Sequence, residues 1–212
     1  MPIPIPTLYH QLVEKHGPQG WWPLLGLKKY PSGYHKNNYD YPKNGLQVFE
    51  IGVGAILTQN STWKNAEKAL IALKNSHNLH PNKILKLEQP VIAVLIKSAG
   101  YFNQKSYYLK NFSKFFLTLN GKTPTRENLL NVIGIGPETA DSILLYAYKK
   151  PHFIIDTYTQ RFLIRNKIIP SKQPYEKLKK MMEDAVSPYI KIYQEFHALI
   201  VEEEKRVGKI NG

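Results

Sequence analysis

Two helical patterns in the sequence are separated by only a few residues, within the run Gly134-Ile-Gly-Pro137. The first pattern ends near Val132, so the short connection predicts a tight hairpin between two helices. Glycine permits positive φ angles and close backbone approach, and proline suits the first turn of a helix. Such a hairpin presents backbone N–H groups that bind an anion, for example a phosphate. The alternative is a plain helical corner whose glycines only allow packing.

Most of the remaining chain also shows helical periodicity, with apolar residues recurring every three or four positions. Patterns typical of strands are nearly absent, so we expect an all-α protein. A stretch crowded with Gly, Pro, Tyr, Asn and Lys, from Gly17 to Gly45, is expected to be a loop. The expected helices cover residues 7–15, 49–57, 64–74, 91–98, 105–119, 127–132, 139–148, 157–166, 175–186 and 189–207.

The charge of the chain favours a polyanionic partner. Its 29 Lys and Arg against 16 Asp and Glu give a formal net charge of +13, which leaves DNA, RNA and acidic membranes as candidates. No apolar run approaches the roughly 20 residues of a membrane span, and the N-terminus lacks the pattern of a signal peptide. We therefore expect an intracellular, cytoplasmic protein that does not span a membrane. The 7 histidines are scattered without metal-ligand spacing, so no metal site is expected.

A single carboxylate, Asp156, follows the apolar segment 153–155 and directly precedes the helix expected at 157–166. An Asp at this place is commonly a helix N-cap. The helix dipole favours the ionised form of such a side chain. A capping role and a catalytic role are therefore compatible.

The run GIGPETADSILLYA, followed by IIDTYTQRF, resembles the signature of the helix-hairpin-helix base-excision DNA glycosylases, in their endonuclease-III-like branch. Segments 49–70, 98–112 and 195–207 are similar as well, and they occur in the expected order. The resemblance covers nearly the whole chain. It implies a monomeric enzyme that binds double-stranded DNA containing a damaged base, in the nucleoid.

The resemblance also implies a two-lobed, all-α fold with an interdomain cleft. One lobe would be a continuous helical barrel domain, residues 46–152, which contains the hairpin. The other would be a second helical domain that both termini form, residues 1–45 plus 153–212. Asp156 would lie in the cleft.

In this family the Asp that maps onto Asp156 stabilises the oxocarbenium-like sugar and activates water as the N-glycosidic bond breaks. Bifunctional members carry a lysine at the position of Glu138, and a carboxylate cannot form a Schiff base. We therefore expect a monofunctional glycosylase that leaves the abasic site intact. The residues expected to bind the DNA backbone, with a monovalent cation at the hairpin carbonyls, are Ile133, Gly134, Ile135, Gly136, Glu138 and Thr139.

The extruded base requires a pocket, and the gap in the duplex requires a wedge. Gln59 and Asn60 match the wedge position, with a polar pair at a helix end as the alternative. Lys105 is expected to contact a phosphate, with a solvated surface lysine as the alternative. The pocket walls are expected from four residues, with interdomain core as the alternative: Trp21, Trp22, Pro23 and Phe49.

Aromatic walls attract a cationic base, because a ring face carries partial negative charge. Together with a resemblance to the 3-methyladenine glycosylases of the same branch, this favours an alkylated purine such as 3-methyladenine as substrate. The chain has no cysteine, so the iron–sulfur cluster of most endonuclease-III-like relatives is not expected. Hydrolysis requires no other cofactor.

Some departures and rival functions stay open. In certain cluster-free alkyladenine enzymes a functional lysine follows the histidine that corresponds to His197, whereas Ala198-Leu199 follow it here. One rival is a glycosylase for oxidised or mismatched bases, with or without lyase activity at abasic sites. Others are a noncatalytic helix-hairpin-helix DNA-binding protein and a purely structural basic protein.

Overall fold

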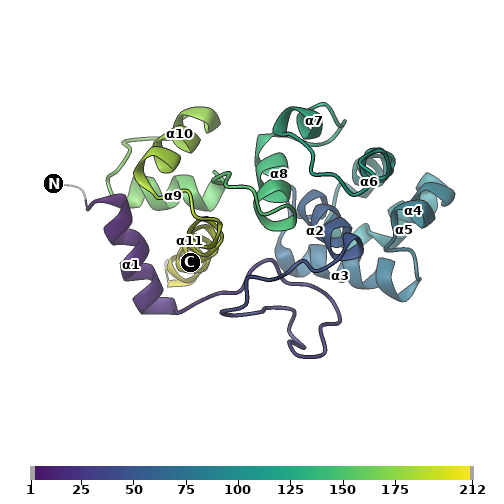
Figure 1. Ribbon diagram of the computed structural model, residues 1–212, viewed down its shortest axis with the longest axis horizontal. Coiled ribbons are helices and arrows are strands. Elements are labelled where there is room, and N and C mark those ends of the chain that lie inside the picture. The colour runs from purple at the N-terminus through teal and green to yellow at the C-terminus, as the bar shows by residue number, and fades with distance from the viewer. Residues whose placement is uncertain (1–2, 211–212) are drawn as a thin grey trace. The chain divides into compact units, whose positions relative to one another are not determined.

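A computed structural model describes residues 3–210 of the chain, without the side chains of residues 209 and 210 (Figure 1). Within these residues every regular element is a helix, which confirms the all-α prediction. The chain divides into two compact units. Residues 40–148 form the first, and the residues up to Tyr39 together with those from Lys149 onward form the second. The expected boundaries lay at residues 46 and 152.

The core of the 40–148 unit is built around α2 (Gly45–Leu57), whose residues from Phe49 to Leu57 are all buried. This helix packs most extensively against three others in its unit. Its Gly52 allows the closest of these contacts, because a Cβ atom there would lie 2.2 Å from Cζ of Phe112. The packed neighbours are α3 (Trp63–Asn75), α6 (Phe102–Thr118) and a π-helical turn, η2 (Ile143–Ala147).

Short helices cover α6. The first of them, α4 (Pro81–Lys86), was not expected, because six residues are too few to show a period. Its beginning carries a recognisable pattern, since Pro81 occupies the first turn and the His80 ring accepts a hydrogen bond from the Asn82 N–H at 3.2 Å. The helix expected at 91–98 is instead α5 (Gln89–Leu95), followed by a 3₁₀ turn, η1 (Lys97–Ala99).

The unit formed by both ends of the chain is organised by α11 (Ile190–Ile210), which packs against α1 (Ile5–His16) and α9 (Thr157–Arg165). Its Phe196 is fully buried and meets the rings of Tyr9 and Phe162, from two other segments of the unit, in T-shaped arrangements. A further helix, α10 (Tyr175–Ala185), packs against α1. Burial of aromatic side chains from α1, α9 and α11 therefore forms this core.

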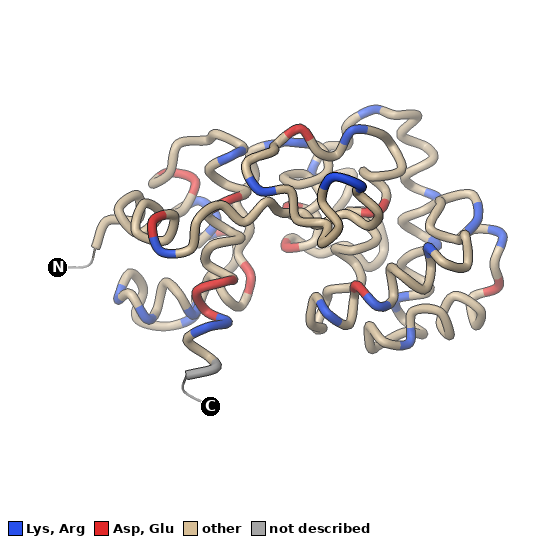
Figure 2. The backbone as a smooth tube through the Cα atoms, turned by 90° about the horizontal axis from the view of Figure 1, so that it is seen from below, with Lys and Arg blue, Asp and Glu red and all other residues tan. Residues whose placement is uncertain are grey.

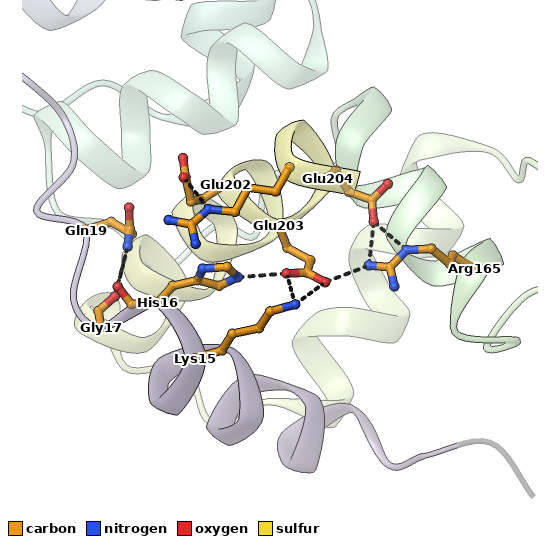
Figure 3. Close-up of polar contacts among 9 residues, drawn as sticks. Lys15, His16, Gly17, Gln19, Arg165, Glu202, Glu203 and Glu204 are labelled. Carbon is orange, nitrogen blue, oxygen red and sulfur yellow. Dashed lines mark hydrogen bonds and ion pairs between the residues drawn. The ribbon is translucent and has the colours of Figure 1, made fainter. Parts of the chain in front are cut away.

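A group of ion pairs reinforces the same three helices (Figure 3). Glu203 of α11 accepts hydrogen bonds from Lys15 at 2.8 Å and from His16 Nε2 at 2.7 Å. Arg165, at the end of α9, lies 3.4 Å from Glu203 and donates to Glu204 at 2.7 Å. Burial raises the pKa of Glu203, but its hydrogen bonds to Lys15 and His16 and the Arg165 charge outweigh burial, so the pKa lies below its ordinary value.

None of the helices that the structure describes is long and apolar enough to cross a membrane. Lys and Arg recur on helices and loops in both units rather than in one segment (Figure 2). The excess of positive charge is thus a property of both parts of the chain.

We expect Glu203→Gln to lower the free energy of unfolding by about 2 kcal/mol or more. The change removes the negative charge that pairs with Lys15 and Arg165 and that accepts the hydrogen bond of the buried His16. The folded-state pKa of Glu203 is depressed, so its stabilising effect should be complete above the ordinary value of 4.5 and fade as the pH falls through the folded-state value. Denaturant unfolding of both proteins at several pH values measures this.

Glu202→Gln is the matched control. In the described contacts Glu202 pairs only with Arg206, one turn away on the same helix, and both side chains of this pair are more exposed than Glu203. That change should alter stability by less than about 0.5 kcal/mol. Equal effects of the two changes would show that the Glu203 contacts do not stabilise the three helices.

Candidate active site

Asp156 is the N-cap of α9 and stands directly after the buried segment Phe153–Ile155. Its Oδ1 atom accepts two hydrogen bonds from one residue, from the Thr159 N–H at 2.7 Å and from the Thr159 hydroxyl at 2.8 Å. Its Oδ2 atom lies 3.6 Å from Nε2 of His197, on α11. The Asp156 side chain is 14% exposed, so it is not fully enclosed. One oxygen is thereby held by the helix, and the other faces the His197 ring.

The surroundings of Asp156 favour its ionised form. Burial raises its pKa, but the nearby His197 ring and the hydrogen bonds from Thr159 outweigh that effect, so the pKa lies below its usual range. The N-terminus of α9 acts in the same direction, because the helix dipole stabilises a negative charge there. The site therefore offers a fixed carboxylate anion near neutral pH.

Trp21 lies beside this carboxylate's histidine partner. Its ring meets the His197 ring nearly perpendicularly, at 82° with centroids 5.8 Å apart, and the Lys205 ammonium lies 5.6 Å from its ring centroid. Trp21 is half-buried, whereas Trp22 and Pro23 are buried. The structure thus places both Trp21 and Asp156 in contact with His197, within one unit.

The segment before Trp21 is anchored by a carboxylate that sequence reasoning did not single out. Glu195 of α11 accepts hydrogen bonds from the N–H groups of Gln19 at 2.7 Å and Gly20 at 3.2 Å. The hydroxyl of Tyr39 also donates to it, at 3.1 Å. Glu195 is 3% exposed, so its charge is neutralised by these donors in a desolvated setting. Glu195 thus anchors the chain just before Trp21, and His197 contacts the Trp21 ring itself. The two residues stand two positions apart on α11, a spacing that does not predict that both act on the same segment.

The predicted hairpin lies in the 40–148 unit, between α7 (Arg126–Leu130) and α8 (Pro137–Ser142). Gly134 has a φ angle of +96°, and a Cβ atom there would lie 2.1 Å from Cγ of Tyr108. A side chain would therefore be strained by the backbone and blocked by the ring. Ile133 is 57% exposed at the tip, whereas Ile135 is buried.

The two hairpin helices are joined by an ion pair between Arg126 and Asp141. Nε of Arg126 donates to Oδ1 of Asp141 at 2.8 Å, and a second guanidinium nitrogen donates to Oδ2 at 3.2 Å. Asp141 is fully buried, so the paired geometry satisfies a charge that water cannot reach. Sequence reasoning missed this pair, because fifteen residues separate the partners and no periodic pattern links them.

The two residues expected as a wedge have different surroundings. Gln59 donates from Nε2 to the Gly134 carbonyl at 2.8 Å and to the Thr139 hydroxyl at 2.9 Å, which ties the end of α2 to the hairpin. Asn60 is exposed and has a φ angle of +48°, as a residue that turns the chain away from a helix does. Glu138 is exposed on the first turn of α8.

Two predicted site residues need correction. Phe49 is fully buried in the core of its unit and stacks on Phe112, with planes 7° apart, so its ring offers no free face to a base. Lys105 is 2% exposed, and its ammonium donates to the carbonyls of Leu57 at 2.8 Å and Ala99 at 2.9 Å instead of contacting a phosphate. Burial lowers the pKa of Lys105 to about 8. Helical spacing alone does not reveal that a lysine points inward.

Among the residues that the structure describes, no group of three or more His, Asp or Glu side chains is placed to hold a metal ion. The chemistry on offer is a carboxylate with an adjacent histidine and aromatic ring in one unit, and a glycine-rich helical hairpin in the other.

Comparison with known proteins identifies relatives of this arrangement. Residues 53–188 match the family model described as HhH-GPD superfamily base excision DNA repair protein. A protein of Methanocaldococcus jannaschii, whose name provisionally assigns it to the DNA repair glycosylases, is 37% identical over 94% of this chain and 86% of its own length. Endonuclease III of Thermotoga maritima is 28% identical over 70% of this chain and 73% of its own.

Solved structures show the same fold. The 3-methyladenine DNA glycosylase MagIII of H. pylori, bound to 1,N6-ethenoadenine, has a TM-score of 0.67 and 28% sequence identity, over 79% of this chain and 92% of that one. A trapped covalent intermediate of endonuclease III with DNA has a TM-score of 0.73 and 14% identity, over 93% of this chain and 83% of that one. The second likeness concerns the fold alone.

We expect Gly134→Ala to destabilise the 40–148 unit by about 2 kcal/mol or more, since it adds backbone strain and a clash with the Tyr108 ring. Binding of a DNA duplex should weaken with it. Gly45→Ala is the control, because its Cβ atom would meet nothing within 4 Å. If chemical denaturation gives the two variants the same stability, the tight hairpin is not a constraint on the fold.

We expect Lys105→Met to lower the free energy of unfolding by about 2–4 kcal/mol, because the two buried carbonyls lose their donor. At a temperature where the variant is folded, the salt dependence of DNA affinity should be unchanged, whereas loss of a phosphate contact would reduce its slope by about one. Lys68→Met, at an exposed position on α3, is the stability control. If the variant shows a smaller salt dependence of DNA affinity without a loss of stability, the sequence-based prediction that Lys105 contacts a phosphate would be correct after all.

Proposed function

Because the chain belongs to the HhH-GPD superfamily of base excision DNA repair proteins, and is a DNA glycosylase of that family, we propose that it excises an alkylated purine without cutting the strand. The observation that carries the proposal is the carboxylate of Asp156, whose surroundings favour its ionised form, with the His197 ring in contact with both Asp156 and Trp21. The hairpin of the other unit would hold the DNA backbone.

In the proposed reaction, Asp156 acts when the bond between the base and the deoxyribose breaks. Positive charge develops on the sugar, and a carboxylate that is already fixed and ionised stabilises it without reorganisation. Since Thr159 holds Oδ1, Oδ2 is the atom we assign to the sugar and to the attacking water. Water then adds to the sugar carbon, its proton is lost, and an intact abasic strand remains.

Absence of strand cleavage is proposed from Glu138. Its exposed carboxylate occupies the first turn of α8, where a lysine nucleophile would be needed to form a Schiff base with the sugar. We also propose a monovalent cation at the hairpin carbonyls. The Gly134 carbonyl accepts one hydrogen bond from Gln59, which leaves its second lone pair for such an ion.

The choice of an alkylated purine is supported by Trp21 and by the likeness to MagIII. Trp21 is the one member of the expected pocket that is not buried, so its ring is the surface we assign to the extruded base. MagIII, at 28% identity, is a 3-methyladenine DNA glycosylase whose structure contains bound 1,N6-ethenoadenine. N-alkylation labilises the glycosidic bond. Stacking of the base on Trp21 and the negative charge of Asp156 are therefore sufficient for its hydrolysis in this proposal.

A second candidate is a neutral oxidised or mismatched base. The Lys205 ammonium over the Trp21 ring would repel a cationic base, and it would favour a base that departs as an anion. Duplexes with alkylated, oxidised and mismatched bases, incubated with and without alkali, separate the candidates. Excision of an alkylated purine that yields strand breaks only after alkali is the expected result. Breaks without alkali would contradict the proposed absence of lyase activity.

We expect Asp156→Asn to lower the single-turnover excision rate by at least about a hundredfold, because it removes the charge that opposes the developing cation. Affinity for the lesion duplex should stay within about tenfold. Asp184→Asn is the control, because Asp184 is an exposed aspartate of the same unit that pairs with Lys180. Equal excision by the Asp156 variant and wild type would defeat the mechanism, and binding without excision by the wild type would indicate a noncatalytic DNA-binding protein.

A further inference from the structure

The two oxygens of Asp156 are held by different parts of the unit. Oδ1 is fully engaged by the amide and hydroxyl of Thr159, on the same helix. Oδ2 receives no hydrogen bond in the described contacts, and the group that faces it is the His197 ring of α11, with Nε2 at 3.6 Å. This separation exceeds a hydrogen bond by a few tenths of an ångström, so the contact is electrostatic in character.

The His197 ring is itself held in place. It is 5% exposed, and α11 packs along α9, so the ring cannot swing away from the N-terminus of α9 without opening the core. The Trp21 ring closes its other side edge-on. The residue on α11 that precedes it by two, Glu195, ties down the chain just before Trp21. His197 therefore sits at a fixed point between the carboxylate and the aromatic surface.

Few other charged groups act on Asp156 within this unit. On α9 its own contact is the uncharged Thr159. The carboxylates of α11 that face α9, Glu203 and Glu204, lie at the opposite end of that helix and pair with Arg165. Glu195 is bonded to the chain near Trp21. His197 is thus the titratable side chain that the described contacts place against Oδ2.

We propose that His197 is a positioning residue for excision, which keeps Oδ2 of Asp156 ionised and aimed while its ring edge orients Trp21. This inference rests on the proposed function, in which Asp156 acts on the sugar. It is independent of the lesion. A histidine ring nitrogen near Oδ2 favours the carboxylate over the carboxylic acid, and a fixed ring keeps Trp21 at a constant distance from that carboxylate.

Two variants of the full chain separate the electrostatic role from packing. His197→Phe keeps the aromatic edge against Trp21 and removes both ring nitrogens. His197→Gln keeps an amide donor near the position of Nε2 and removes the charge. We expect His197→Phe to lower the single-turnover rate about 10- to 100-fold with little change in duplex affinity. His197→Gln should recover part of that rate.

The pH dependence of the excision rate distinguishes this role from a merely structural one, which would leave that dependence unchanged. In both variants the acid limb of the excision rate should shift to higher pH, by about one unit or more, because Asp156 is protonated more easily without its histidine. A wild-type rate and an unmoved acid limb in either variant would overturn the inference. If His197→Phe does not fold, the acid limb of His197→Gln decides.

A ¹³C NMR titration of the Asp156 carboxyl, in the wild type and in His197→Gln, keeps this test separate from the test of function. The apparent pKa of Asp156 should rise in the variant, and an unchanged value would overturn the inference. If the wild-type protein excises no base from any duplex, the proposed function has failed. The titration still shows whether His197 controls the ionisation of Asp156.

Discussion

The burial of three carboxylates on α11 is the constraint on which the second unit depends. Glu195, Glu203 and Glu204 are each at most 6% exposed, and a desolvated carboxylate is tolerated only where donors surround it. The donors come from different parts of the unit. Glu195 binds the chain before Trp21, Glu203 binds α1, and Arg165 joins Glu203 and Glu204 to α9. Satisfying these charges fixes where the loop, α1 and α9 lie around α11.

The same helix thereby organises the candidate active site. Its His197 lies between Glu195 and the Glu203 group, and it faces Asp156 on one side and Trp21 on the other. The site is consequently preorganised by contacts whose loss would also destabilise the unit.

In the 40–148 unit the main constraint is the tight turn of the hairpin at Gly134. Gly134 accepts a positive φ, the Tyr108 ring fills the space beside it, and the Arg126–Asp141 pair clamps the flanking helices. Gln59 adds hydrogen bonds from the end of α2. The backbone of the turn is therefore rigid before any DNA arrives, which suits contacts that depend on main-chain groups.

The sequence by itself determined the helical class, the hairpin at Gly134 to Gly136 and the helix-capping place of Asp156, because local periodicity, glycine and capping chemistry depend on near neighbours in the chain. It also determined the family resemblance. Only the tertiary structure decided that Phe49 stacks in a core, that Lys105 points inward to two carbonyls, and that His197 faces Asp156. The physical reason is that burial and pairing are set by residues distant in sequence, and helical spacing predicts which face of a helix is apolar but not which partner covers it.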